Sequence, residues 1–116
     1  MNVKTLKNLL ADGRSRILLV DVREPDELSD EPYFEILPEN YIPLSLTVLS
    51  VMPESELREK MIGILDHLGW KKEDARIVTL CRSGRRSEMA LIYFSRIGFP
   101  AESLDGGYGA WMTESD

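Results

Sequence analysis

The stretch that decides the fold of this chain runs from Ile77 to Ser87 and reads Ile-Val-Thr-Leu-Cys-Arg-Ser-Gly-Arg-Arg-Ser. Its first four residues are rich in β-branched side chains and predict a buried strand that ends at Cys81. After Gly84 the apolar residues recur at helical spacing until Gly98 stops the run. The sequence therefore predicts a strand that leads the only cysteine of the chain into a tight turn, which opens a helix.

A cysteine in such a turn is favoured as a thiolate. If residues 82–86 curl around the sulfur, their backbone N–H groups and the start of the following helix point at it and favour an anion. Arg82, Arg85 and Arg86 lie in or beside the same turn, and nearby cations lower a cysteine pKa from about 8.5. The alternative is that Cys81 is only a small buried apolar residue, as most free cysteines are. Three arginines within five residues favour the reactive thiol.

Length and composition predict one soluble globular domain over residues 1–116. The chain is long enough for one sizeable core and too short for two, and 43% hydrophobic with 29% charged residues disfavours disorder. A net charge of −6 argues against a general nucleic-acid surface, which needs clustered positive charge. The arginines near Cys81 are a local exception that suits a small anion.

The single cysteine and the apolar pattern predict a cytoplasmic protein. One cysteine excludes an intramolecular disulfide, and a reactive lone thiol is best suited to a reducing compartment. The apolar run within Met1 to Arg14 is too brief for a signal-peptide core. No stretch approaches the roughly 18 apolar residues of a membrane span, so no membrane association is expected.

Four motifs occur in the order found in one known family. The loop from Cys81 to Ser87 resembles the active-site loop of rhodanese-like sulfurtransferases. The segment Leu19–Pro25 followed by Glu27-Leu28 resembles the Asp-Val-Arg-Glu signature of that family, and Ile42–Leu44 resembles its Asn-Ile-Pro-Leu strand. The segment from Gly98 through Leu104-Asp105-Gly106-Gly107 to Trp111 resembles its closing segment. Together the motifs span about residues 17–111.

One segment departs from the family pattern. Relatives usually read Gly-His-Ile-Pro-Gly-Ala before the third strand, whereas this chain has Phe34-Glu35-Ile36-Leu37-Pro38-Glu39 after a loop that is longer by about three residues. The segment from Glu24 to Glu39 holds seven acidic and no basic residues. It predicts a solvated loop with one helical turn around Asp26 to Leu28, or alternatively a docking patch for a basic partner.

Helical and strand patterns alternate along the chain. Helices are expected over residues 5–11 and 55–68, after Gly84 and from Tyr108, and strands over residues 17–22, 42–46, 76–80 and 101–104. This alternation predicts a mainly parallel sheet covered by helices on both faces. The resemblance implies the α/β rhodanese fold with a small five-stranded sheet, in which the Cys81 loop follows a central strand. Residues 105–107 are expected to form a flexible turn.

The resemblance implies a transferase that carries sulfur as a persulfide on Cys81, with no cofactor and no metal. Asp21, Arg23 and Ser87 are expected to support the loop. The Asp21–Arg23 segment either braces the loop arginines or forms a plain ion pair. Ser83 and Ser87 either donate hydrogen bonds in the loop or cap the helix, and capping is expected for at least one of them. The remaining loop residues are expected to bind the substrate: Arg82, Ser83, Gly84, Arg85 and Arg86.

The expected partners are a small sulfur-donor anion such as thiosulfate and an acceptor such as cyanide, a thiol or a protein. Among the arginines, Arg86 is expected to brace the loop, and Arg82 or Arg85 to contact the donor. One alternative is a cysteine-dependent phosphatase or arsenate reductase. Those loops place five residues between cysteine and arginine, whereas four separate Cys81 from Arg86. Another is a non-catalytic persulfide carrier or interaction module, against which the intact cysteine and cationic loop argue.

Overall fold

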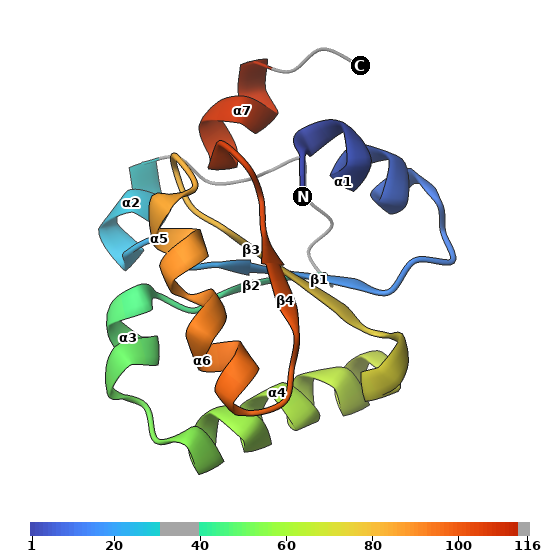
Figure 1. The fold of residues 1–116 in the computed structure, drawn as a ribbon, viewed down its shortest axis with the longest axis vertical. Coiled ribbons are helices and arrows are strands. Elements are labelled where there is room, and N and C mark those ends of the chain that lie inside the picture. The colour runs from blue at the N-terminus through green and yellow to red at the C-terminus, as the bar shows by residue number, and fades with distance from the viewer. Residues whose placement is uncertain (31–39, 114–116) are drawn as a thin grey trace.

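A computed structural model describes residues 1–30 and 40–113. Its centre is a sheet of four parallel strands in the spatial order β2-β1-β3-β4 (Figure 1). The strands are β1 (Ile17–Asp21), β2 (Tyr41–Pro43), β3 (Arg76–Leu80) and β4 (Ala101–Ser103). Parallel strands need crossover connections, and here helices supply them.

Helices lie on both faces of this sheet (Figure 1). One face is covered by α1 (Val3–Ala11) and α7 (Gly107–Thr113), and the other by α3 (Leu46–Val51), α4 (Glu54–Leu68), α5 (Arg85–Met89) and α6 (Leu91–Arg96). A short helix, α2 (Pro25–Asp30), follows β1, and a single 3₁₀ turn, η2 (Lys72–Asp74), precedes β3.

The core consists of two apolar clusters that the sheet separates. Alternate residues of a strand point to opposite faces, so Leu18 and Val20 join the cluster under α4, whereas Ile17 and Leu19 join the cluster under α1. All four side chains are fully buried. A strand buried on both faces reads as a continuous apolar run, which explains the pattern at residues 17–22. The predicted α/β architecture, a parallel sheet with helices on both faces, is confirmed.

The sheet has four strands within the described residues, where five were predicted. Beside β4, Met1 makes two backbone hydrogen bonds, from its amino group to the Ser103 carbonyl and from the Asp105 N–H to its own carbonyl, both at 2.8 Å, but α1 begins at Val3 and no strand forms there. The second strand is also shorter than predicted. It ends at Pro43 because Ser45 is the N-cap of α3, with its side chain accepting a hydrogen bond from the Val48 N–H at 3.2 Å. Pro43 lies on an edge strand, as proline requires.

The remaining differences concern helix boundaries. The helical turn predicted around Asp26 is present as α2, and the helix predicted after Gly84 is divided into α5 and α6 at Ala90. The departure from the family pattern at 34–39 lies outside the described residues. No helix among the described residues is long and apolar enough to cross a membrane.

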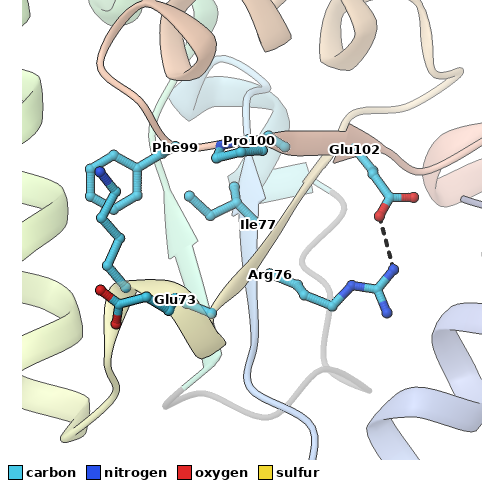
Figure 2. A pocket seen from close by; sticks show the side chains of 9 residues that line it. Glu73, Arg76, Ile77, Phe99, Pro100 and Glu102 are labelled. Atoms are coloured by element: carbon cyan, nitrogen blue, oxygen red, sulfur yellow. Dashed lines mark hydrogen bonds and ion pairs between the residues drawn. The ribbon is translucent and has the colours of Figure 1, made fainter.

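A hollow of about 470 Å³ lies at the amino ends of β3 and β4 (Figure 2). On one side of it the Arg76 guanidinium donates to the Glu102 carboxylate at 2.9 Å, and on the other the Lys72 ammonium lies 4.7 Å from the centre of the Phe99 ring. Cys81 follows the carboxyl end of β3. The hollow is therefore at the opposite end of that strand from Cys81.

Candidate active site

Cys81 lies directly beyond β3, and its sulfur is held by the loop that follows. The Sγ atom accepts hydrogen bonds from the Gly84 N–H at 3.1 Å and from the Ser87 N–H at 3.4 Å. Gly84 adopts a φ of 97°, a left-handed conformation that glycine reaches without steric cost. This turn directs the chain back over the sulfur and then into α5. Cys81 has no exposed surface.

The hydrogen bonds around the sulfur favour the thiolate. Burial raises the pKa of the Cys81 thiol, but hydrogen bonds from the Ser87 hydroxyl and from the N–H groups of Ser87, Gly84 and Ser83 together hold that pKa below its usual value. The groups that lower the pKa of Cys81 most are thus neutral hydrogen-bond donors, and not the arginines that the sequence pattern indicated. The loop therefore favours the thiolate, which is the nucleophilic form of a cysteine.

Ser87 supports the sulfur and does not cap a helix. Its hydroxyl donates to the Gly84 carbonyl oxygen at 3.0 Å and lies 3.6 Å from the sulfur of Cys81. The Thr79 hydroxyl donates a hydrogen bond to the Ser87 carbonyl oxygen at 2.8 Å and so fixes the backbone of Ser87. The first turn of α5 has Gly84 at its N-cap, without a side-chain cap. The prediction that Ser83 or Ser87 caps this helix was therefore wrong, because the tight turn brings Ser87 to the sulfur.

Arg86 joins the loop helix α5 to α2. Both of its terminal nitrogens donate to the Glu27 carboxylate, Nη2 at 2.7 Å and Nη1 at a shorter distance. The hydrogen bonds from Arg86 lower the pKa of Glu27 to about 2, and the same contact raises the pKa of Arg86. A bidentate pair fixes the orientation of a guanidinium. Glu27 is part of the quoted signature, but the sequence analysis did not place it at the site.

Replacing Glu27 with glutamine is expected to lower stability near neutral pH by about 1 kcal/mol, because the pair is partly exposed. The native pKa of Glu27 is lower than its unfolded value, so its contribution is complete above about pH 4.5 and falls as the pH drops toward 2. The difference between wild type and Glu27→Gln should therefore shrink on acidification. Denaturant unfolding at neutral pH and near pH 3 measures this.

The matched control for this experiment is Asp26→Asn, which removes an exposed carboxylate from the same helix. It should leave stability within about 0.5 kcal/mol of wild type at both pH values. A Glu27→Gln difference that stayed constant between the two pH values would show that the Glu27 carboxylate is not the titrating group.

The other two loop arginines lie at the surface. Arg82 and Arg85 are both exposed, and Arg85 lines a groove of about 620 Å³ beside the loop. Ser83 and Gly84 line the same groove. The three arginines of the motif therefore differ in position: Arg86 pairs with α2, whereas Arg82 and Arg85 flank the turn.

Asp21 and Arg23 form a buried ion pair at the carboxyl end of β1. Arg23 Nη2 lies 3.0 Å from Asp21 Oδ2, and Asp21 and Arg23 are 0% and 1% exposed. The Tyr41 hydroxyl also donates to Asp21, at 2.5 Å. The guanidinium of Arg23 packs over the ring of Tyr108, 5.6 Å from its centre. The pair thus reaches the loop through Tyr108.

The start of α7 holds the carbonyl groups at the base of the loop. The Tyr108 N–H donates to the Cys81 carbonyl at 2.7 Å, and the Gly109 N–H donates to the Arg82 carbonyl at 3.0 Å. Gly107, the first residue of α7, is buried against the backbone of Cys81 and Arg82 and has a φ of 58°. The turn predicted at residues 105–107 is present at Asp105 and Gly106, and Gly107 begins α7 and packs against the loop. The Gly106-Gly107 pair was the available signal, since consecutive glycines also occur where backbones approach closely.

The arrangement defines a class of site: a thiol cradled by backbone N–H groups at the carboxyl end of a central parallel strand. The described residues hold no group of three or more His, Cys, Asp or Glu side chains suited to a metal. Asp21 and Glu27 are each engaged by an arginine. The chemistry that these residues support is nucleophilic attack by sulfur.

The chain belongs to the rhodanese-like domain family, whose model matches residues 2–114. The fold is similar to that of the human single-domain sulfurtransferase TSTD1, with 25% identity, a TM-score of 0.69, and coverage of 100% of this chain and 96% of that one. No curated protein matched the sequence.

Two further solved structures share the fold. A protein of unknown function from Rhodopseudomonas palustris, described as a possible tyrosine phosphatase, has 24% identity and a TM-score of 0.67, over 96% of this chain and 76% of that one. A rhodanese-related protein from Thermoplasma volcanium has 24% identity and a TM-score of 0.61, over 97% of this chain and 88% of that one.

Proposed function

We propose that this protein is a sulfurtransferase that moves a sulfane sulfur from a donor such as thiosulfate to a thiophilic acceptor through a persulfide on Cys81. The observation that carries the proposal is the cradle itself. Hydrogen bonds from Gly84 and Ser87 converge on one sulfur atom and stabilise its anion. A persulfide anion needs the same donors. The likeness to the human single-domain sulfurtransferase supports the same conclusion.

The reaction has two displacement steps. In the first, the Cys81 thiolate attacks the outer sulfur of thiosulfate, the sulfur–sulfur bond of the donor breaks, and sulfite leaves with the bonding electron pair. In the second, an acceptor such as cyanide attacks the outer sulfur of the Cys81 persulfide. The persulfide bond then breaks, thiocyanate leaves, and the thiolate is restored. The thiolate is the nucleophile in the first step and the leaving group in the second, so a lowered pKa assists departure.

The partners follow from these steps as a small sulfur-donor anion and a thiol, cyanide or protein acceptor. We place the protein in the cytoplasm, where a reducing environment keeps a lone cysteine available.

The loop arginines provide a way to recognise the donor. Because Arg86 is engaged by Glu27, we propose that Arg82 or Arg85 contacts the sulfonate end of thiosulfate. Replacing the contacting residue with alanine should raise the KM for thiosulfate about tenfold, with a much smaller effect on an uncharged persulfide donor. Lysine should restore part of the loss, since it keeps the charge without the planar fork.

Steady-state kinetics with both donors measures this, and Arg96→Ala on α6 is the matched control because Arg96 is exposed and lies outside the loop. Equal losses on the two donors for both loop variants would contradict a dedicated anion contact. The arginines would then act only as a positive field around the thiolate.

A second candidate is phosphate-ester hydrolysis, because a similar structure is described as a possible tyrosine phosphatase. One feature argues against it. The ring of donors closes on a single sulfur, with the Gly84 N–H only 3.1 Å from it. A phosphoryl group would need a wider ring.

The test is to incubate the protein with thiosulfate, determine its intact mass, and then add cyanide. The proposal expects a mass increase of one sulfur atom, followed by its loss and the release of thiocyanate. Hydrolysis of an aryl phosphate with no sulfur loading would reverse the ranking of the two candidates. If the protein gained a sulfur atom but passed it to no acceptor, the result would contradict transfer and support the persulfide-carrier alternative.

A further inference from the structure

Two serine hydroxyls from different elements meet beside the cysteine sulfur. Ser87 on α5 is fully buried, and its Oγ lies 3.6 Å from Cys81 Sγ. Ser103, the last residue of β4, is half-buried and places its Oγ only 2.6 Å from Ser87 Oγ. Because Ser87 contacts both atoms, a continuous line of polar atoms leads from the sulfur to the edge strand.

The hydrogen-bonding capacity of Ser87 decides what this line can do. A serine hydroxyl has one proton to donate and two lone pairs that accept. Ser87 directs that proton to the Gly84 carbonyl at 3.0 Å, and this carbonyl can only accept. The short contact with Ser103 is then made with Ser103 as the donor. When the thiolate forms, the proton of Ser87 can turn from the Gly84 carbonyl to the sulfur while Ser103 remains bound to its oxygen.

We propose that Ser103 is a positioning residue for Cys81, whose hydroxyl donates to Ser87 and thereby directs the Ser87 proton toward the thiolate. The inference deepens the proposed function and rests on it for its catalytic consequence. In a chain of hydrogen bonds each donor strengthens the next, and the effect is larger where water is excluded. Cys81 and Ser87 are both fully buried. The hydrogen bonds that link them to Ser103 therefore lie where water is excluded and where their mutual strengthening is largest.

The charged groups around the sulfur do not take part in the hydrogen bonds that link Ser103, Ser87 and Cys81. Arg86 acts on Cys81 from α5, and Glu27 holds Arg86 from α2. Glu102 precedes Ser103 on β4, but its side chain is directed to Arg76. The Met1 ammonium donates to the Ser103 carbonyl at 2.8 Å, a contact to the main chain that does not involve the Ser103 hydroxyl. Changing the Ser103 side chain therefore removes a neutral donor without removing any of these contacts.

The test compares Ser103→Thr with Ser103→Val, two β-branched side chains of nearly equal shape that suit a strand. Only threonine keeps the hydroxyl. The readout is the rate of Cys81 alkylation by iodoacetamide, an uncharged probe, as a function of pH. The threonine variant should keep the wild-type midpoint, whereas the valine variant should show a midpoint higher by about 0.5 pH unit and about threefold slower alkylation below it.

Ser95→Ala is the control, since Ser95 is exposed on α6, and it should match wild type. Equal midpoints for the threonine and valine variants would overturn the proposal. If the valine variant does not fold, as judged by thermal unfolding, Ser103→Ala replaces it with the same expectation. Alkylation uses no sulfur donor, so failure of the proposed function would appear separately, as absent thiocyanate release with the midpoints still shifted.

Discussion

The Cys81→Ser protein is expected to form no persulfide and to release no thiocyanate, with activity lower than wild type by at least about a thousandfold. Serine preserves the size of the side chain and can accept the same N–H hydrogen bonds, but its hydroxyl is a far weaker nucleophile in this cradle. The fold should survive, with a stability change within about 2 kcal/mol. Intact mass after thiosulfate treatment and thiocyanate release after cyanide measure the chemical loss, and thermal unfolding measures the fold.

The matched control is wild-type protein blocked with iodoacetamide, which occupies the same sulfur without changing the sequence. It should lose the same activity as Cys81→Ser. A Cys81→Ser protein that still gained the mass of one sulfur atom would show that sulfur binds elsewhere, because the chain has a single cysteine.

Local patterns predicted the strands that matter most. The apolar runs at residues 17–22 and 77–80 are buried on both faces, so a continuous run of such residues identifies the two central strands, β1 and β3. The turn at Gly84 and the position of Cys81 followed from the same stretch. Trp111, the end of the last motif, packs in the core, being 8% exposed, with Lys7 over its ring.

Local sequence patterns did not predict the contacts between segments that are far apart in the sequence. Glu27 meets Arg86 across 59 residues, and Ser103 meets Ser87 across 16 residues, through the packing of α2 and β4 against α5. No periodicity predicts which acidic residue of a charged loop, or which serine of a short strand, will make such a contact. The number of strands was also overestimated, because the family resemblance supplied it and the residues did not.

Three elements therefore support the loop from three directions. α2 holds it through Glu27, β4 contacts it through Ser103, and α7 binds the backbone carbonyls at its base through Tyr108 and Gly109. Of these, the α7 contact is the least tolerant of change, because it joins backbone to backbone. Side chains can rotate away from a clash, whereas packed backbones must separate.

Replacing Gly107 with alanine is expected to destabilise the protein by at least about 3 kcal/mol, which corresponds to a thermal midpoint lower by roughly 12 °C. A Cβ atom at this position would lie 2.1 Å from the Cys81 carbonyl oxygen and 2.9 Å from the carbonyl carbon of Arg82. The φ of 58° adds strain for any residue with a side chain. To relieve the clash, α7 must move away, which breaks the hydrogen bond from Tyr108 to Cys81.

Gly63→Ala provides the matched control, since a Cβ at Gly63 meets nothing within 4 Å and this glycine lies inside α4. Alanine there should raise stability by about 0.5–1 kcal/mol, because it is the better helix former. Thermal unfolding of both variants, together with the pH profile of Cys81 alkylation, separates loss of fold from loss of cradle geometry. A Gly107→Ala protein with a wild-type midpoint in both measurements would show that α7 does not press on the cysteine loop, and that the loop keeps its shape without this support.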